Sequence, residues 1–490
     1  MQRPGKSDDI IVPPKVTNKI PKVWRSGWRV GCRPRGTRMS DSATGHRAGT
    51  QAMSPLMRVR EAARKDKTEV FTALFHHLSQ ELLSSSFRQL KRSSAKGVDG
   101  VFWQAFQESL SSNIEQLHKE IQSGQYKPSP SRRVQIPKAD GTARLLSIQC
   151  VRDNVVQQAT SELHNQIYET EFLVFSYGFR PGRSQHDALD ALTFGLQKRK
   201  VNWLLDLDIQ KFFDSVEHDW LIEMVRHRIK DGRLINLIIK WIQVGRVNEK
   251  GKREPSHRGI PEGAVIFPLL ANIHLHYVFD LWGNQWRKCK AKGTVLLIRF
   301  ADDAVFCFQY KSDADKFVSN LRTRLEQFGL TQHPDKTRLL RLGRFARKQS
   351  MEKESIKVAS FVFLGFTHFC TIKRNGEFQV GRKTAKLNSQ IQAFQQELRK
   401  RFHRPVRETA QWIASVLRGH INYFGVPGNA KSLIRLHEEV SRRWLKMLRR
   451  RSQRSKITWS VFGRWVKCCL PKVRIVHQYP EKRFYAKYLR

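Results

Sequence analysis

The sequence predicts an α+β fold that ends in a separate helical region. Residues 201–208 alternate between two faces in the manner of a β-strand. Residues 295–300 and 304–308 are two apolar runs around a very short turn, which is typical of paired strands. After about residue 385 the apolar residues recur at helical spacing, so a mixed sheet-and-helix body is expected to precede an all-helical end.

The composition of the chain indicates a nucleic-acid partner. Its 490 residues include 89 Lys and Arg against 43 Asp and Glu, which gives a net charge of +46. A chain with this charge binds polyanions through phosphates. The seven cysteines include no CxxC pair, which argues against a disulfide framework and against a zinc site. No apolar run approaches the ~20 residues that span a bilayer, so no membrane partner is expected.

The N-terminal half of the chain contains a tail, helices and a hairpin. Residues 1–56 are rich in Pro, Gly, Ser, Thr and Arg and are expected to be a mostly disordered basic tail. Apolar residues at helical spacing predict a helix over 69–90. Residues 131–148 predict a β-hairpin around the turn ADGT, with Lys138 and Arg144 near its two ends.

The helices of the second half follow from apolar stripes. Residues 152–169 predict a helix, and residues 175–189 predict a Gly/Pro loop that enters another helix. Three amphipathic helices with basic outer faces are expected near the C-terminus. Their apolar stripes contain Leu387, Ile391, Phe394 and Leu398, then Trp412, Ile413, Val416 and Leu417, then Leu433, Leu436, Val440 and Met447.

Adjacent carboxylates interrupt the apolar run LLIRFADDAVFCF. Asp302 and Asp303 fit a plain turn between two strands, because Asp is a common turn residue. However, Asp208 ends another apolar strand, and two strands that deliver carboxylates to one sheet edge form an oxygen-rich site for hard cations. Two Mg²⁺ ions about 3.5–4 Å apart in such a site support phosphoryl transfer. The pattern therefore favours metal-assisted chemistry on nucleic acid.

At this point a family resemblance becomes specific. Five segments occur in the order of reverse-transcriptase motifs: LDIQKFFD, GIPEGAVIFPLLANIHLHYVFD, FADD, HPDKTRL and FVFLGF. Three more segments resemble further blocks of group II intron reverse transcriptases: AKGVDG, IPKADGTAR and SYGFRPGRSQHDAL. The thumb and maturase region of that family resembles VLRGHINYFGVPGN and RRWLKMLRRRSQRSKITW. The resemblance implies a right-hand polymerase, with fingers and a palm built on a ferredoxin-like sheet over 57–380. An α-helical thumb or maturase domain with a basic C-terminal segment would follow over 381–490.

The resemblance also implies a catalytic centre. Asp208 and Asp302 match the metal ligands of the family, the Ile209 carbonyl is an additional ligand, and Asp303 is the third carboxylate. Lys336 matches the motif after the catalytic hairpin. Asp206 and Asp214 have no implied role and are expected to be solvated or structural.

The nucleotide and primer sites are implied in the same way. Phe213 matches the gate that excludes a ribose 2′-OH, and Lys138 and Arg144 match cationic contacts to the incoming triphosphate. Glu262 lies beside the nucleotide pocket, where the family usually has Gln. The primer grip corresponds to the segment FLGF, which is Phe363, Leu364, Gly365 and Phe366.

The RNA contacts follow from the charge pattern. Arg180 and Arg183 lie in the loop SYGFRPGRS, which is either a plain turn or a contact to template phosphates. Arg449, Arg450 and Arg451 belong to a basic run that ordinarily forms a solvated face, but its position after a thumb favours binding of intron RNA.

Four departures from the family pattern bear on activity. FADD replaces the commoner YADD and loses only a hydroxyl. Glu262 replaces Gln, Phe267 replaces a small Ser, and ARLLSIQC lacks the usual proline and glycine after the arginine. The last three leave open a weakened or inactive polymerase.

The sequence thus predicts a group II intron-encoded reverse transcriptase and maturase. It would extend a DNA primer on intron RNA with dNTPs and Mg²⁺ during retrohoming, and it would bind the intron to assist RNA splicing. The expected lineage is the bacterial one that lacks a C-terminal endonuclease, acting in the cytoplasm at the nucleoid. Two alternatives stay open: a non-mobile reverse transcriptase, for example in phage defence, and an RNA-binding splicing cofactor with an impaired polymerase.

Overall fold

A computed structural model gives the fold of this chain, with α1 (Pro55–Lys65) as its first helix. The residues that it describes are 54–137, 143–247, 252–254, 258–343, 359–373, 375–451 and 457–488. Nearly all of the tail expected at 1–56 lies outside them. Among the described residues, no helix is both long enough and apolar enough to cross a membrane.

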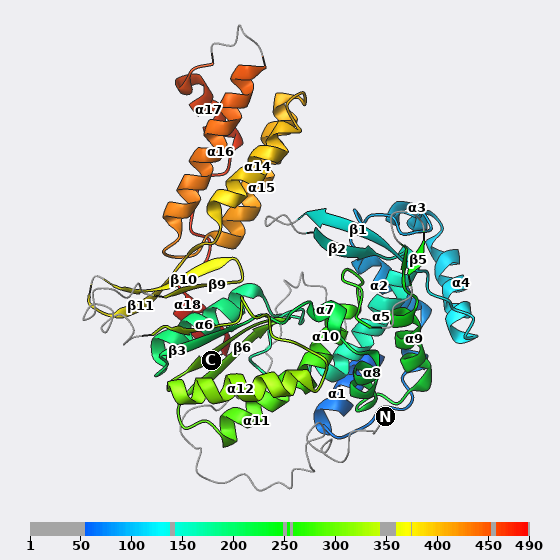
Figure 1. The fold of residues 1–490 in the computed structure, drawn as a ribbon. Helices are drawn as coiled ribbons and strands as arrows, with labels where there is room; N and C mark the ends of the chain where they lie inside the picture. The colour runs from blue at the N-terminus through cyan, green and yellow to red at the C-terminus, as the bar shows by residue number, and fades with distance from the viewer. Residues whose placement is uncertain are drawn as a thin grey trace, which may run out of the picture.

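A four-stranded antiparallel sheet, called the central sheet below, lies in the middle of the molecule (Figure 1). Its order is β6-β7-β3-β8. The strands are β3 (Trp203–Leu207), β6 (Val295–Phe300), β7 (Asp303–Phe308) and β8 (Arg338–Arg341). The three strands expected at 201–208, 295–300 and 304–308 are therefore confirmed.

Both faces of the central sheet are apolar and covered by helices. Leu205, Leu207 and Phe306 pack into one core, against α10, η3, α11 and α12, while Leu204 and Val305 pack into a second core beneath α6. This is the two-sided alternation that the sequence of β3 predicted. The covering helices are α6 (Gln185–Lys198), α10 (Phe267–Leu275), η3 (His276–Asp280), α11 (Leu281–Cys289) and α12 (Lys311–Glu326). Because the faces are filled, polar chemistry has room only at the ends of the strands.

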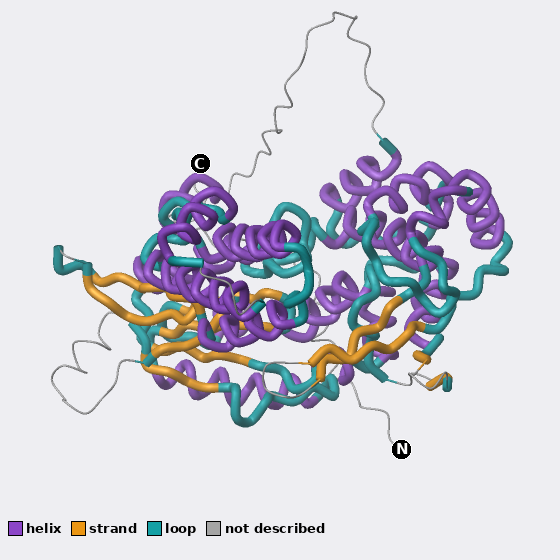
Figure 2. The backbone as a smooth tube through the Cα atoms, turned by 90° about the horizontal axis from the view of Figure 1, so that it is seen from above, coloured by secondary structure: helices purple, strands orange, loops and turns teal. Residues whose placement is uncertain are grey.

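A helical layer formed by the N-terminal half lies beside the central sheet (Figure 2). Its helices are η2 (Phe75–His77), α2 (Gln80–Gln89), α3 (Trp103–Glu108), α4 (Leu110–Gln122), α5 (Val151–Tyr168), α7 (Phe212–Ser215), α8 (His218–Arg226) and α9 (Gly232–Gln243). A second sheet of order β2-β1-β4-β5 borders this layer. Its strands are β1 (Ser131–Pro137), β2 (Ala143–Ile148), β4 (Arg246–Val247) and β5 (Arg253–Glu254). The predicted hairpin at 131–148 and the predicted helix at 152–169 are both confirmed.

Only the second half of the helix expected over 69–90 is present, as α2 (Gln80–Gln89). It begins at Gln80, where the Ser79 side chain accepts a hydrogen bond from the backbone of Leu82. The preceding segment is held by a distant part of the chain. Asp231 accepts hydrogen bonds from the backbone N–H groups of Leu74 and Phe75 at 2.7 and 2.8 Å. These tertiary bonds satisfy donors that a continuous helix would have used.

The C-terminal region begins with a third sheet and continues into a projecting helical arm (Figure 1). The third sheet has the order β11-β10-β9 and contains β9 (Ser360–Phe363), β10 (Phe366–Ile372) and β11 (Phe378–Thr384). The helical arm, a name used below for α14 to α17, consists of α14 (Leu387–Arg399), α15 (Val406–Phe424), α16 (Ala430–Arg450) and α17 (Trp459–Cys469). Its core contains most of the predicted apolar stripes, but Val416 is exposed and was wrongly included.

The last helix, α18 (Pro480–Tyr488), leaves the arm and packs on α6. Phe484 stacks on Phe194 at a centroid distance of 4.5 Å, and Arg483 lies 2.7 Å from the Asp190 carboxylate. A single C-terminal unit was expected over 381–490, but the residues of α18 pack on α6 and not on the helical arm. They belong with the central sheet.

Phe267 packs inside the core. It is the first residue of α10, only 1 % of its surface is exposed, and it belongs to the core shared by the central sheet and the N-terminal layer. We expect Phe267→Ala to lower the free energy of unfolding by about 3–5 kcal/mol, because the substitution leaves a cavity. Thermal or urea unfolding measures this loss. The control Phe267→Leu should lose clearly less, and equal stability of Phe267→Ala and the unmodified chain would contradict the packing.

Three histidines are buried without charge. Burial lowers the pKa of His164 to about 4, and those of His274 and His368 to about 3, from an ordinary value of 6.5. Below that value the unfolded chain binds protons that the folded chain does not, so stability falls as the pH drops from 6.5 towards 4. Each such histidine contributes about 1.4 kcal/mol per pH unit.

We therefore expect the unfolding temperature to drop between about pH 7.5 and about pH 5.5, and His274→Leu to reduce that drop. His274 is the informative position because burial alone lowers its pKa. Differential scanning calorimetry at the two pH values makes the comparison. An identical drop in the variant would show that His274 is already protonated in the folded chain.

Candidate active site

Strand register brings three of the predicted carboxylates to one edge of the central sheet. Leu207 of β3 pairs with Ala304 of β7, and Asp208 follows directly after that pair. On the other side, Phe300 of β6 pairs with Asp303, so residues 301 and 302 form a two-residue turn. Asp208 and the pair Asp302-Asp303 therefore end at the same edge, called the carboxylate edge below.

The side chains at the carboxylate edge repel one another. Asp303 remains accessible to solvent, although protein surrounds it on most sides. The pKa of the Asp303 carboxyl is raised to about 7. The first cause is that surrounding protein partly desolvates the carboxylate, and the second is the negative charge of Asp302, Asp208 and Asp206. Burial also raises the pKa of Asp206 to about 6.

Asp206 was expected to have no part in this edge, yet its charge contributes to the field at Asp303. The signal was present in the sequence, because strand alternation places Asp206 on the same face as Asp208. Asp214 lies on α7. Its exposed carboxylate is 3.9 Å from Arg246, which fits the solvated or structural role that was expected.

Lys336 and the loop that carries it contact Asp208. The Lys336 Nζ lies 3.4 Å from the Asp208 Oδ2 and is itself exposed. The backbone N–H of His333 donates to the Asp208 carbonyl at 2.8 Å, and the Thr337 hydroxyl also bonds to the Asp208 backbone. The predicted motif HPDKTRL thus packs directly beside the carboxylate edge.

The edge offers oxygen ligands of the kind that Mg²⁺ prefers. Among the described residues, no group of three or more His, Cys, Asp or Glu is arranged so that it could hold a metal ion. In proteins generally, one or two carboxylates can hold Mg²⁺ when water and substrate phosphates complete its coordination. The side chain of Ile209 is buried, so only its backbone carbonyl is a candidate ligand. The excess of negative charge at Asp303 is what a bound cation would offset.

Phe213 and Glu262 lie on two segments that are bonded to each other. The carbonyl of Phe213 accepts a hydrogen bond from the Ile260 backbone at 2.7 Å. Gly259 has a φ of +82°, and a Cβ at this position would lie 2.9 Å from the Phe213 carbonyl oxygen. Glu262 follows in the same segment, and its carbonyl accepts from Ser147 of β2 at 2.7 Å. Residues 259–262 therefore join the Phe213 turn to the β1–β2 hairpin.

The predicted triphosphate contacts cannot be followed to their side-chain atoms. Lys138 lies outside the described residues, and for Arg144 the structure describes the backbone only, paired with Ile136. The hairpin that carries both residues is tied to Glu262 through Ser147. Their assignment stays a prediction.

The segment FLGF forms a tight turn between β9 and β10. Leu364 and Gly365 both have positive φ, at 45° and 76°, while Phe363 and Phe366 on either side are buried. Tyr423 of α15 donates its hydroxyl proton to the Leu364 carbonyl at 2.9 Å. The turn that was predicted to grip the primer is thus bonded to the base of the helical arm.

The structure corrects the RNA contact expected of Arg180. Its guanidinium is buried, forms a two-pronged pair with Glu169 at 2.9 and 2.9 Å, and donates to the carbonyls of Leu173 and Ser176. Each of its three guanidinium nitrogens has a partner within the protein, so the side chain is structural. Arg183 is half-buried and donates to the Val174 carbonyl at 2.7 Å, and its RNA contact stays a prediction.

The predicted basic run at the end of α16 is not uniform. Arg449 and Arg450 are exposed. Arg451 is half-buried and donates to the Arg401 carbonyl at 3.2 Å. Arg449 and Arg450 are therefore the exposed members of this run, although the Arg449 Nε donates to the Ile457 carbonyl at 2.9 Å. Arg451 connects two parts of the arm.

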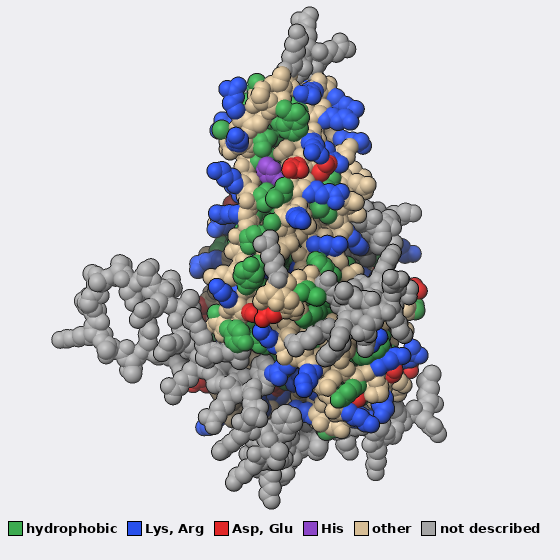
Figure 3. Space-filling view, turned by 90° about the vertical axis from the view of Figure 1, so that its left-hand side faces the viewer, with side chains coloured by type: hydrophobic (Ala, Val, Ile, Leu, Met, Phe, Trp, Pro, Cys, Tyr) green, Lys and Arg blue, Asp and Glu red, His purple; other side chains and the backbone are tan. Residues whose placement is uncertain are grey.

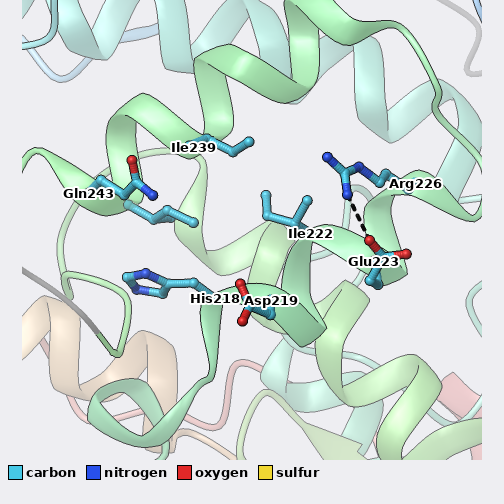
Figure 4. Close-up of a pocket in the computed structure, with 8 residues that line it drawn as sticks. His218, Asp219, Ile222, Glu223, Arg226, Ile239 and Gln243 are labelled. Atoms are coloured by element: carbon cyan, nitrogen blue, oxygen red, sulfur yellow. Dashed lines mark hydrogen bonds and ion pairs between the residues drawn. The ribbon is translucent and has the colours of Figure 1, made fainter. Parts of the chain in front are cut away.

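A hollow of about 220 Å³ lies between α8 and α9, away from the carboxylate edge (Figure 4). Its lining includes Ile222, Ile239 and the pair Glu223–Arg226, whose atoms are 2.7 Å apart. None of the carboxylates described above lines it. No predicted site residue lies in this hollow, so it has no assigned role.

Comparisons with known proteins agree with the geometry. Residues 136–368 match the family described as reverse transcriptase (RNA-dependent DNA polymerase). The chain is 31% identical over 321 residues to protein YkfC of Escherichia coli, covering 59% of this chain and 80% of that protein. It is 32% identical over 232 residues to group II intron-encoded protein LtrA of Lactococcus lactis, covering 46% of this chain and 37% of LtrA.

The chain is also similar to a yeast intron protein. The putative COX1/OXI3 intron 2 protein of Saccharomyces cerevisiae is 35% identical over 168 residues, which is 34% of this chain and 19% of that protein. The chain thus spans well under half of the intron-encoded proteins that it matches. Together with the carboxylate edge, these matches show that the chain belongs to the reverse transcriptase family, among its group II intron-encoded members.

Proposed function

We propose that the chain extends a DNA primer on a group II intron RNA and also binds that RNA to assist its splicing. The observation that supports this most directly is the carboxylate edge, where Asp208, Asp302 and Asp303 meet beside Lys336 in a reverse transcriptase fold. Retrohoming would take place where intron RNA and target DNA meet, in the bacterial cytoplasm at the nucleoid.

The parts of a right-hand polymerase can be assigned to the three bodies of the structure. The central sheet would be the palm, the β1–β2 hairpin and the N-terminal helices would be the fingers, and the helical arm would be the thumb and maturase domain. The β9–β10 turn supports this assignment, because a primer grip must lie between palm and thumb and this turn is bonded to Tyr423 at the base of the arm.

Asp208, Asp302 and the Ile209 carbonyl would hold the divalent metal ions, two Mg²⁺ in this proposal. When bound, the ions would activate the primer 3′-hydroxyl and stabilise the charge of the leaving pyrophosphate. Asp303 would add negative charge that keeps cations at the edge, and Lys336 would offset part of that charge until substrate arrives. Phe213 would limit the space at the sugar, while Lys138 and Arg144 would contact the triphosphate.

Glu262 is proposed to weaken nucleotide use without abolishing it. An ionised carboxylate accepts hydrogen bonds but cannot donate them, and it repels the anionic substrate. The burial of Phe267 in the core supports a structural role for this residue, and its departure from the family pattern is then a weak argument for an inactive polymerase. This favours the active enzyme over a splicing cofactor with an impaired site.

The maturase role is proposed from charge. Figure 3 shows Lys and Arg side chains spread along the helical arm, with few Asp and Glu among them. Such a surface binds RNA through its phosphates, and affinity then falls steeply with salt. Arg449 and Arg450 belong to this surface.

Asp302→Ala should reduce primer extension on an RNA template by at least about 100-fold, because the variant loses a metal ligand. Intron binding should persist, since the basic surface is untouched. The matched control is Asp315→Ala, which removes an exposed carboxylate on α12. Single-nucleotide incorporation and filter binding measure the two properties. Full extension by Asp302→Ala would refute the metal assignment.

Charge reversal at Arg449 and Arg450 should weaken intron binding, whereas the KM for dNTP should not change. The slope of log affinity against log salt should become shallower by about 1–2, one for each phosphate that the variant no longer neutralises. The control with the same charge change is reversal of Lys316 and Arg322, which are exposed on α12. An equal loss of affinity in the control would mean that net charge, and not the end of α16, determines binding.

A further inference from the structure

The turn of the carboxylate edge contains a strained residue. Ala301 has a φ of +58°, a left-handed conformation that is unfavourable for a residue with a Cβ. The neighbouring loop backbone lies directly against it. A Cβ added at Gly178 would lie 2.3 Å from the Ala301 nitrogen. A strained turn in such close contact needs partners that hold it in one conformation.

Arg299 supplies those partners from beneath the turn. Only 1 % of its surface is exposed. Its Nη1 donates to the Ala301 carbonyl at 2.9 Å and to the Asn272 Oδ1 at 3.0 Å. Its Nη2 donates to the Ser176 hydroxyl at 2.7 Å and to Asp280 at 2.5 Å, and its Nε donates to Asp280 at 2.7 Å. All five donors of the guanidinium are therefore used.

The charge of Arg299 is balanced within the core. Burial alone would raise the pKa of Asp280, but the charge of Arg299 and its hydrogen bonds hold that pKa below its usual value. His276 lies 3.9 Å from the same carboxylate. A buried ion pair gives little stability beyond what apolar packing of the same volume would give. What this pair adds is a fixed direction for the bond to Ala301.

The same network holds the loop that packs on the turn. Asn272 donates from its Nδ2 to the Gly178 carbonyl at 2.7 Å. The backbone of Arg299 pairs with the loop on both sides, accepting from Tyr177 at 2.8 Å and donating to Phe175 at 2.9 Å. Loop 175–178 and the turn at 301–302 are thus attached to one guanidinium.

We propose that Arg299 is a positioning residue for the carboxylate edge. By bonding the Ala301 carbonyl, it fixes the strained turn and so sets the direction in which Asp302 and Asp303 face the metal ions. Through Asn272 and Ser176 it couples that direction to loop 175–178. This inference rests on the proposed polymerase function.

Arg299→Lys tests the proposal. Lysine keeps a positive charge beside Asp280 but cannot supply five donors in a fork. The matched control is Arg324→Lys, because Arg324 is also buried and donates to two backbone carbonyls, of Val278 and Tyr277, without touching the turn. The milder variant Ser176→Ala removes one partner of Arg299 and keeps the ion pair.

The measurements are the unfolding temperature, kcat and KM for primer extension, and Mn²⁺ binding to the full chain by electron paramagnetic resonance. We expect Arg299→Lys to lower kcat at least about tenfold and to weaken Mn²⁺ binding at least about threefold, with the KM for template-primer within about twofold. Arg324→Lys should lower the unfolding temperature and leave Mn²⁺ binding unchanged.

Two results would overturn the positioning role. One is a folded Arg299→Lys with unchanged kcat and Mn²⁺ affinity, and the other is an equal loss of Mn²⁺ affinity in Arg324→Lys. If Arg299→Lys does not fold, Ser176→Ala decides: weaker Mn²⁺ binding supports the proposal, and unchanged binding refutes it. If the unmodified chain extends no primer, the proposed function fails, while Mn²⁺ binding still tests Arg299.

Discussion

Repulsion among carboxylates at one sheet edge is the constraint on which the rest of this structure depends. The register of β3 on β7 and the short β6–β7 turn bring Asp208, Asp302 and Asp303 together, and Asp206 adds its charge from the same face. Nearby cations offset only part of this charge, since the pKa of Asp303 is still raised to about 7. Both faces of the sheet are filled by apolar side chains, so the edge cannot relax by moving into the core. A bound cation, as proposed above, would offset this charge.

Four arginines form ion pairs inside the protein, and one of them, Arg299, also bonds the turn at the carboxylate edge. Arg180 pairs with Glu169, Arg228 with Glu171, Arg382 with Asp190, and Arg299 with Asp280, and all four guanidinium groups are buried. In Arg382–Asp190 and Arg299–Asp280 the pair joins different secondary-structure elements. The net charge of +46 therefore overstates the basic surface that is open to RNA, because some of the arginines are buried in ion pairs. It also explains why a loop rich in arginine, such as residues 176–184, can be mainly structural.

The base of the helical arm is fastened to the central body at two places. At one, Tyr423 bonds the β9–β10 turn, and Asn429 bonds the backbone of Thr384 and the carbonyl of Phe424. At the other, α18 returns from the end of the arm to α6 through Arg483 and Phe484. A displacement of α18 would therefore act on α6, which packs over Leu204 and Val305 on one face of the central sheet.

The sequence by itself determined what depends on short-range pattern. Strand alternation identified β3 and its two faces, the apolar runs around Asp302 and Asp303 identified the β6–β7 turn, and helical stripes identified the arm. Only the tertiary structure decided the fate of side chains whose partners lie far along the chain. Arg180 and Arg183 look alike in the loop SYGFRPGRS, but only Arg180 meets Glu169 and becomes buried. Segment 69–79 has helical periodicity, but the N–H groups of Leu74 and Phe75 bond the distant Asp231. The physical reason is that periodicity records which face is apolar, whereas desolvation and charge pairing depend on neighbours that only folding brings into contact.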